Sequence, residues 1–126
     1  MPEFSKNTQV PQCVKTDVSK SVLISDKCKL DFEKWLEKQE VSPYKAMFYD
    51  VPKIVQVSYL IDFFDFIGIT VDVMPRMNEE KIIFEPNTFC LKHEITTEDF
   101  IQFDQRIDAI ISAIQKANVI YNENFV

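Results

Sequence analysis

Residues 52–74 read PKIVQVSYLIDFFDFIGITVDVM, and their apolar pattern changes at Gly68, the only glycine in the chain. Before Gly68, a helix over 52–67 is apolar almost all round, except for a narrow sector of one serine and two aspartates. After Gly68, apolar and polar residues alternate, which is typical of a strand with one buried face over 69–74. Glycine readily takes the left-handed conformation that ends a helix. The pattern therefore predicts a helix, a glycine stop and a strand.

Toward the C-terminus, the pattern predicts two further strands and a long helix. A second strand is expected over about 81–85, and the alternation of 89–95 indicates a third. Short connections favour an antiparallel order. Thr96 or Thr97 is expected to cap a final helix over about 97–121, whose apolar residues recur at helical spacing.

Toward the N-terminus, the pattern predicts two more helices and an arm. The helices are expected over about 27–39 and 43–49, and the polar residues 1–20 indicate an extended N-terminal arm. Residues 21–126 then form a single domain. The expected fold is α+β, with a small three-stranded antiparallel sheet and the helices packed mainly on one face.

Composition narrows the classes of function. The chain has 126 residues and a net charge of −6, and residues 42–126 hold thirteen acidic against seven basic residues. An acidic surface lacks the basic footprint of nucleic-acid binding, so we expect no direct contact with nucleic acid and a basic protein as the partner. A single glycine excludes glycine-rich phosphate loops, and we expect no cofactor.

The cysteines and the N-terminal segment indicate a reducing compartment. Cys13, Cys28 and Cys90 are odd in number and lack CxxC spacing, and no signal peptide is recognisable. The longest apolar stretch, 54–74, carries three aspartates, so we expect no membrane association. Twelve lysines against two arginines are typical of AT-rich genomes, including many phages. The expected location is the cytoplasm, the host's if a phage encodes the chain.

Two groups of side chains are candidates for chemistry. Cys90 and His93 lie three positions apart in the expected third strand and so point to opposite faces, which argues against a dyad or a metal site. Asp62, Asp65 and Asp72 are a candidate carboxylate set for a hydrolase or a Mg²⁺ site. No histidine signature accompanies them, and we predict neither catalytic nor metal-binding residues.

The strongest candidate is an interface. A second apolar face of the 52–67 helix comprises Val55, Tyr59, Phe63 and Phe66. Left uncovered, this face would form a larger apolar patch than monomers usually tolerate, so the N-terminal arm, another helix of the same domain or a second chain must cover it. Asp104 and Asp108 lie four apart on the expected final helix, where either a basic partner or water can offset their repulsion. These six residues are the predicted interaction surface.

The leading hypothesis is a non-enzymatic protein-binding module. It is an accessory or inhibitor protein of a phage or mobile element that engages a basic or nucleic-acid-binding protein. One alternative is a structural subunit of a virion or other assembly, which includes a homo-oligomer. A second alternative is a small carboxylate-dependent hydrolase.

Overall fold

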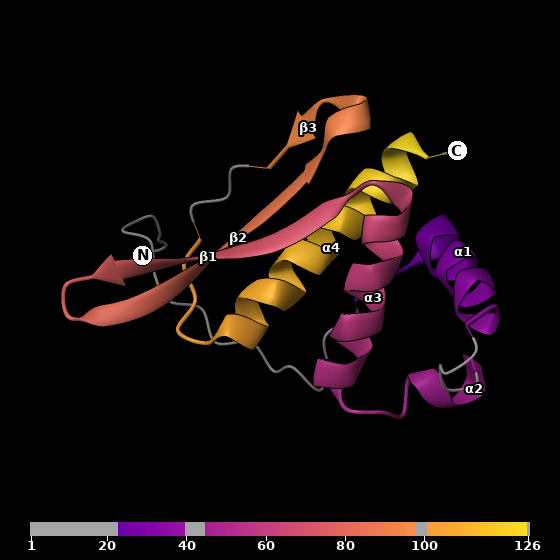
Figure 1. The fold of residues 1–126 in the computed structure, drawn as a ribbon, viewed down its shortest axis with the longest axis horizontal. Helices are drawn as coiled ribbons and strands as arrows, with labels where there is room; N and C mark the ends of the chain where they lie inside the picture. Colours follow the sequence, from indigo (N-terminus) through magenta and orange to yellow (C-terminus); the bar gives the residue numbers. More distant parts are fainter. Residues whose placement is uncertain (1–22, 40–44, 98–100, 126) are drawn as a thin grey trace, which may run out of the picture.

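A computed structural model describes residues 23–39, 45–97 and 101–125 (Figure 1). Its elements in chain order are α1 (Asp26–Glu37), α2 (Lys45–Phe48), α3 (Lys53–Ile67), β1 (Thr70–Asn78), β2 (Lys81–Cys90), the 3₁₀ helix η2 (Leu91–His93), β3 (Ile95–Thr96) and α4 (Arg106–Asn124). The strands form one antiparallel sheet in the order β1-β2-β3, which confirms the predicted α+β fold. The expected arm over 1–20 lies outside the described residues.

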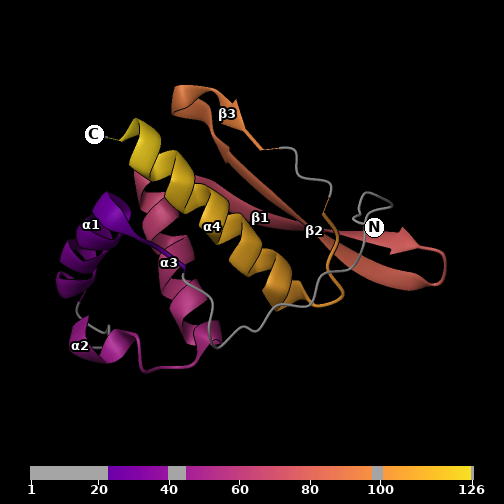
Figure 2. The same cartoon turned by 180° about the vertical axis from the view of Figure 1, so that it is seen from behind.

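The helices surround a core at one end of a long hairpin. In both ribbon views α4 crosses the β1–β2 hairpin, while α3 and α1 lie beside α4 (Figures 1 and 2). Gly68 ends α3 in the left-handed conformation, with φ of 95°, as predicted. The core combines apolar side chains of all three long helices: Phe32 and Leu36 of α1, Leu60 and Phe64 of α3, and Ile111 and Ile114 of α4.

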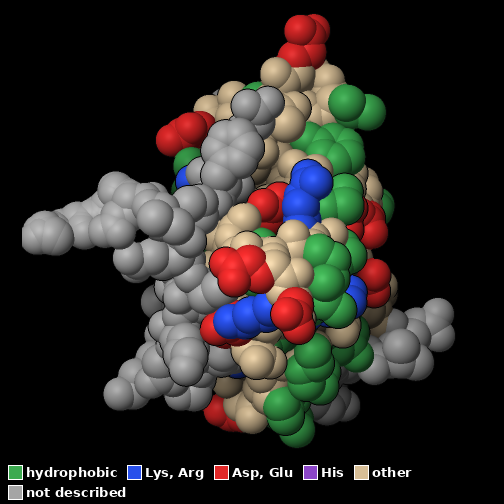
Figure 3. Space-filling view, turned by 90° about the vertical axis from the view of Figure 1, so that its left-hand side faces the viewer, with side chains coloured by type: hydrophobic (Ala, Val, Ile, Leu, Met, Phe, Trp, Pro, Cys, Tyr) green, Lys and Arg blue, Asp and Glu red, His purple; other side chains and the backbone are tan. Residues whose placement is uncertain are grey.

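The hairpin strands are longer than the predicted 69–74 and 81–85. They pair continuously from Thr70 to the tight turn between Asn78 and Lys81, where Glu79 has φ of 60°. The strands continue past the core, and the hairpin end projects from the body (Figure 1). Seen from that end, hydrophobic side chains run down one side of the face next to charged ones (Figure 3).

Two prolines lie inside these strands, where prolines usually interrupt pairing. Pro75 lies on β1, an edge strand. On such a strand a residue can lack its N–H without loss of a hydrogen bond between strands. Pro86 lies in β2 between Phe84 and Thr88, whose backbones hydrogen-bond two separate segments. Phe84 bonds Phe103 and Thr88 bonds Thr97, so the missing N–H of Pro86 lies between these two segments and removes no hydrogen bond from either.

The predicted third strand, 89–95, is wrong in its bounds. Its first two residues end β2, η2 follows, and only Ile95–Thr96 form β3. Glu94 takes the left-handed conformation, with φ of 55°, and turns the chain back along β2. Because the alternating apolar pattern continues through this reversal, the sequence does not indicate that the strand ends at Cys90.

The predicted start of the last helix is also wrong, because α4 begins at Arg106 rather than near Thr97. The backbone N–H and the hydroxyl of Thr97 both donate to the carbonyl of Thr88, so Thr97 extends the sheet and caps no helix. Phe103 pairs with Phe84 in an antiparallel bridge. Sheet contacts therefore hold a segment that local sequence assigns to a helix.

Candidate functional site

The predicted interaction face of α3 is divided between core and surface. Phe63 is only 2% exposed, because α1 and α4 cover it. Its ring centroid lies 5.4 Å from that of Phe32, 5.6 Å from that of Trp35 and 5.9 Å from that of Tyr121. The domain itself therefore buries the central residue of the expected patch.

The other members of that face lie closer to solvent. Phe66 is 73% exposed and Val55 is 38% exposed, whereas Tyr59 is half-buried with its ring 6.2 Å from the ring of Phe48. Ile54, one position before Val55, is 58% exposed. Helical periodicity places residues on a face, but it does not show where neighbouring helices end.

The exposed residues of α3 define a surface that we call the α3 face. Its members are Ile54, Val55, Ser58, Asp62, Asp65 and Phe66. The face combines three apolar side chains with two carboxylates and contains no basic residue. It is therefore both apolar and acidic.

A groove of about 250 Å³ adjoins Phe66 between α1 and α3. Its lining residues are Asp31, Lys34, Trp35, Lys38, Phe63, Phe66, Ile67 and Tyr121. Aromatic rings thus form much of the lining, and Lys34 of α1 and Lys38 at its C-cap also line it.

Two of the lining residues, Asp31 and Tyr121, form a polar link. The carboxylate of Asp31 accepts hydrogen bonds of 2.5 Å from the Lys27 ammonium and 2.5 Å from the Tyr121 hydroxyl. The bonds from Lys27 and Tyr121 hold the pKa of Asp31 below its ordinary value of 3.8. Burial and the bond to Asp31 raise the pKa of Tyr121 above its ordinary value of 10.0. The link joins α1 to α4.

Asp104 and Asp108, the other two predicted interface residues, are not on one exposed helix face. Asp104 precedes α4, and its carboxylate lies 2.5 Å from the ammonium of Lys81 at the hairpin end. Asp108 lies in the first turn of α4 and is buried. The carboxylates therefore do not form the predicted acidic pair for a partner.

The carboxylates Asp62, Asp65 and Asp72 do not form a metal site in the structure. All three are exposed, two on α3 and one on β1, and Asp72 accepts a 2.8 Å hydrogen bond from the N–H of Val73. Across residues 23–39, 45–97 and 101–125, no three His, Cys, Asp or Glu side chains are placed to hold a metal ion. The hydrolase alternative thus gains no support from these residues.

Cys90 and His93 lie on different elements. Cys90 is the buried last residue of β2, whereas His93 belongs to η2 and packs its ring 4.8 Å from the ring of Phe125. Cys28 is a buried free thiol whose pKa is raised to about 12, first by burial and then by the charge of Asp31. A thiol with this pKa is a poor nucleophile near neutral pH.

In the part of the chain that the structure describes, no helix has the length and apolar character needed to cross a membrane. Comparisons with protein families, with curated proteins and with solved structures found no match. The function is therefore inferred from the α3 face and the pockets of this chain.

Proposed function

We propose that this chain is a protein-binding module whose α3 face docks onto a basic protein. The observation that carries the proposal is the exposure of Ile54, Val55 and Phe66 next to Asp62 and Asp65 on one helix. Exposed apolar side chains that gather on one face are typical of interaction surfaces.

The chemistry of the α3 face suits a partner that is both basic and apolar. Exposed aromatic residues such as Phe66 are enriched among the anchors of protein interfaces. Asp62 and Asp65 attract lysine or arginine side chains and speed the encounter with a basic surface. The groove beside Phe66 offers space for an apolar side chain of the partner. Together these features support a mixed apolar and electrostatic contact.

The test compares one interface variant with one matched surface variant. Phe66→Ser removes the proposed anchor, and Leu91→Ser removes a side chain that is 79% exposed on η2. Proteins captured from a lysate by the immobilised wild type are purified, and their affinities for both variants are measured. We expect Phe66→Ser to weaken binding at least tenfold and Leu91→Ser to leave it unchanged. Equal binding by both variants contradicts the proposal.

A second measurement tests the role of the carboxylates. Added salt should weaken wild-type binding, and the double variant Asp62→Asn, Asp65→Asn should show a smaller salt dependence. Light scattering of the free protein separates partner binding from self-association. Wild-type oligomers that Phe66→Ser dissociates would favour the assembly-subunit alternative instead.

A further inference from the structure

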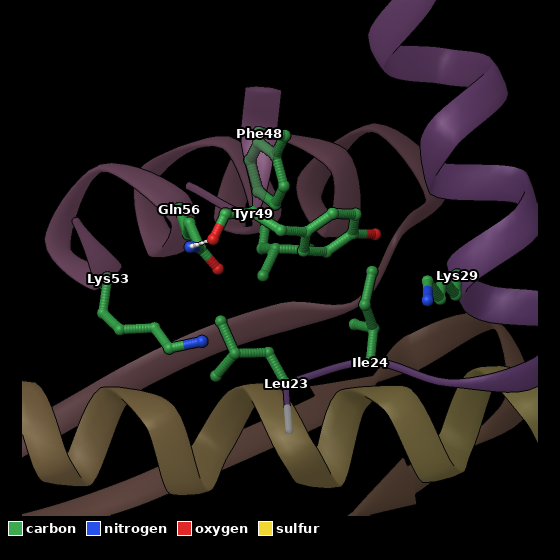
Figure 4. Close-up of a pocket in the computed structure, with 8 residues that line it drawn as sticks. Leu23, Ile24, Lys29, Phe48, Tyr49, Lys53 and Gln56 are labelled. Carbon is green, nitrogen blue, oxygen red and sulfur yellow. Dashed lines mark hydrogen bonds between the residues drawn. The ribbon is translucent and has the colours of Figure 1, made fainter. Parts of the chain in front are cut away.

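A pocket of about 210 Å³ lies between α1, α2 and the start of α3, apart from the α3 face (Figure 4). Its apolar lining consists of Leu23, Ile24, Phe48 and Leu60, all of which are buried. An apolar cavity of about 150 Å³ is large enough to bind benzene. The pocket therefore has room for a ligand with one aromatic ring.

A buried amide gives the pocket a directed hydrogen-bond acceptor. Gln56 is 2% exposed, and its amide nitrogen donates to the carbonyls of Val51 at 2.9 Å and Tyr49 at 3.3 Å. Because both carbonyls only accept, the nitrogen must face them, and Oε1 of Gln56 points into the pocket (Figure 4). Among the described residues, no donor reaches this oxygen. A ligand with a hydroxyl or N–H group would satisfy it.

Among the described residues that line the pocket, both charged side chains are cations, although the chain carries a net charge of −6. Lys29 of α1 and Lys53 of α3 line it from opposite sides, and none of the described residues that line it is acidic (Figure 4). The ammonium of Lys29 lies 5.2 Å from the ring centroid of Tyr49. Neither lysine forms an ion pair with another described residue. The pocket is thus a locally cationic site in an acidic protein.

From these three features we infer that the pocket binds a small organic anion with an apolar ring and a hydrogen-bond donor. The ring contacts the apolar lining, the donor reaches Oε1 of Gln56, and the anionic group meets the ammonium of Lys53. A hydroxylated aromatic carboxylate has this chemistry. The site is independent of the proposed protein-binding face, because none of its lining residues belongs to that face.

The experiment is a titration of the full chain with 4-hydroxybenzoate, followed by NMR. We expect saturable shifts of amides around the pocket. Lys53→Gln should raise the dissociation constant about tenfold, because a charge-assisted hydrogen bond is lost. Lys92→Gln, which neutralises an exposed lysine on η2, is the matched control and should leave it unchanged. Phe66→Ser should also leave the dissociation constant of 4-hydroxybenzoate unchanged. Because Phe66 belongs to the α3 face and not to this pocket, the ligand titration can fail while the protein-binding proposal holds, and the reverse.

Changing the ligand tests the pocket without altering Gln56, whose amide also holds the loop before α3. Benzoate lacks the hydroxyl donor, and 4-hydroxybenzamide lacks the negative charge. We expect each to bind at least tenfold more weakly than 4-hydroxybenzoate. The inference is overturned if 4-hydroxybenzoate does not bind. Equal binding of the three compounds, or an equal affinity in Lys53→Gln and Lys92→Gln, also overturns it.

Discussion

Phe63 and Phe66 show how neighbouring residues of one helix take opposite roles. They lie three positions apart on α3 and both belong to its second apolar face. Phe63 packs among aromatic rings of α1 and α4, whereas Phe66 is 73% exposed beside the groove. Phe66 lies near the C-terminal end of α3, where it escapes this cover. Burial of an apolar residue is thus decided by its neighbours as well as by its own helix.

The two phenylalanines make a matched test. Phe63→Asp places an unpaired charge in the core, and we expect it to lower the free energy of unfolding by about 3–5 kcal/mol or to prevent folding. Phe66→Asp keeps the charge in water, and we expect a change within about 0.5 kcal/mol. Circular dichroism during urea unfolding measures both. Equal stability of the two variants would show that Phe63 is not part of the core.

The start of α1 shows an element that depends on another element for its cap. Ser25 is the N-cap residue, but its side chain makes no capping hydrogen bond. Oδ1 of Asn122 on α4 instead accepts from the N–H of Cys28 at 2.8 Å. Asn118, one turn earlier, accepts from the N–H of Ser25 at 2.9 Å. Two asparagines of the last helix therefore accept from two of the N–H groups at the start of α1.

We expect Asn122→Ala to lower the free energy of unfolding by about 1–2 kcal/mol, as loss of a helix cap does. The Nδ2 of Asn122 also donates to the carbonyl of Ser25 at 3.1 Å, so the variant loses two hydrogen bonds to backbone groups, one from Cys28 and one to Ser25. Glu123→Ala changes the adjacent exposed residue and should alter stability by less than about 0.5 kcal/mol. Chemical denaturation of both variants gives the comparison. If Asn122→Ala unfolds at the same denaturant midpoint as the wild type, water satisfies the N–H groups of α1 as well as Asn122 does.

The whole molecule is closed by contacts between its first and last helices. Besides the asparagine caps, the hydroxyl of Tyr121 on α4 donates to the carboxylate of Asp31 on α1. Residues about ninety positions apart are thereby held together, and α3 packs against both helices. The link depends on an ionised carboxylate and a neutral phenol, so it makes stability depend on pH at both extremes.

The sign of this dependence follows from the two pKa shifts. The pKa of Asp31 is lowered, so its contribution is complete above 3.8 and is lost as pH falls through the lower folded pKa. The pKa of Tyr121 is raised, so its contribution is complete below 10.0 and is lost as pH rises through the folded pKa. We expect Tyr121→Phe to cost about 1 kcal/mol at neutral pH, a small value because Asp31 is partly exposed.

The measurement is urea unfolding of wild type and Tyr121→Phe across the pH range. Other carboxylates also titrate in acid, so the difference between the two proteins isolates the link. We expect this difference to be largest near neutral pH and to shrink in acid and in strong base. A difference that does not vary with pH would show that Tyr121 contributes only its packing.

The sequence alone determined those features that depend on local chemistry. Gly68 ends α3 because glycine takes the left-handed conformation without strain, and alternation marks the start of β1. Helical spacing identified α1, α3 and most of α4, and the order of elements predicted the α+β class. These signals act within a few residues, so they can be recognised in the sequence without knowledge of the tertiary contacts.

Tertiary structure alone decided the rest, because distant segments supply the contacts. Thr97 and Phe103 bond β2 instead of starting a helix, and α4 caps α1 from the far end of the chain. Of the predicted face of α3, only Val55 and Phe66 remain exposed, because α1 and α4 cover Phe63. The cationic pocket combines α1, α2 and α3, and no local pattern indicates it. Packing between segments separated in sequence decides which apolar residues are core and which remain available for binding.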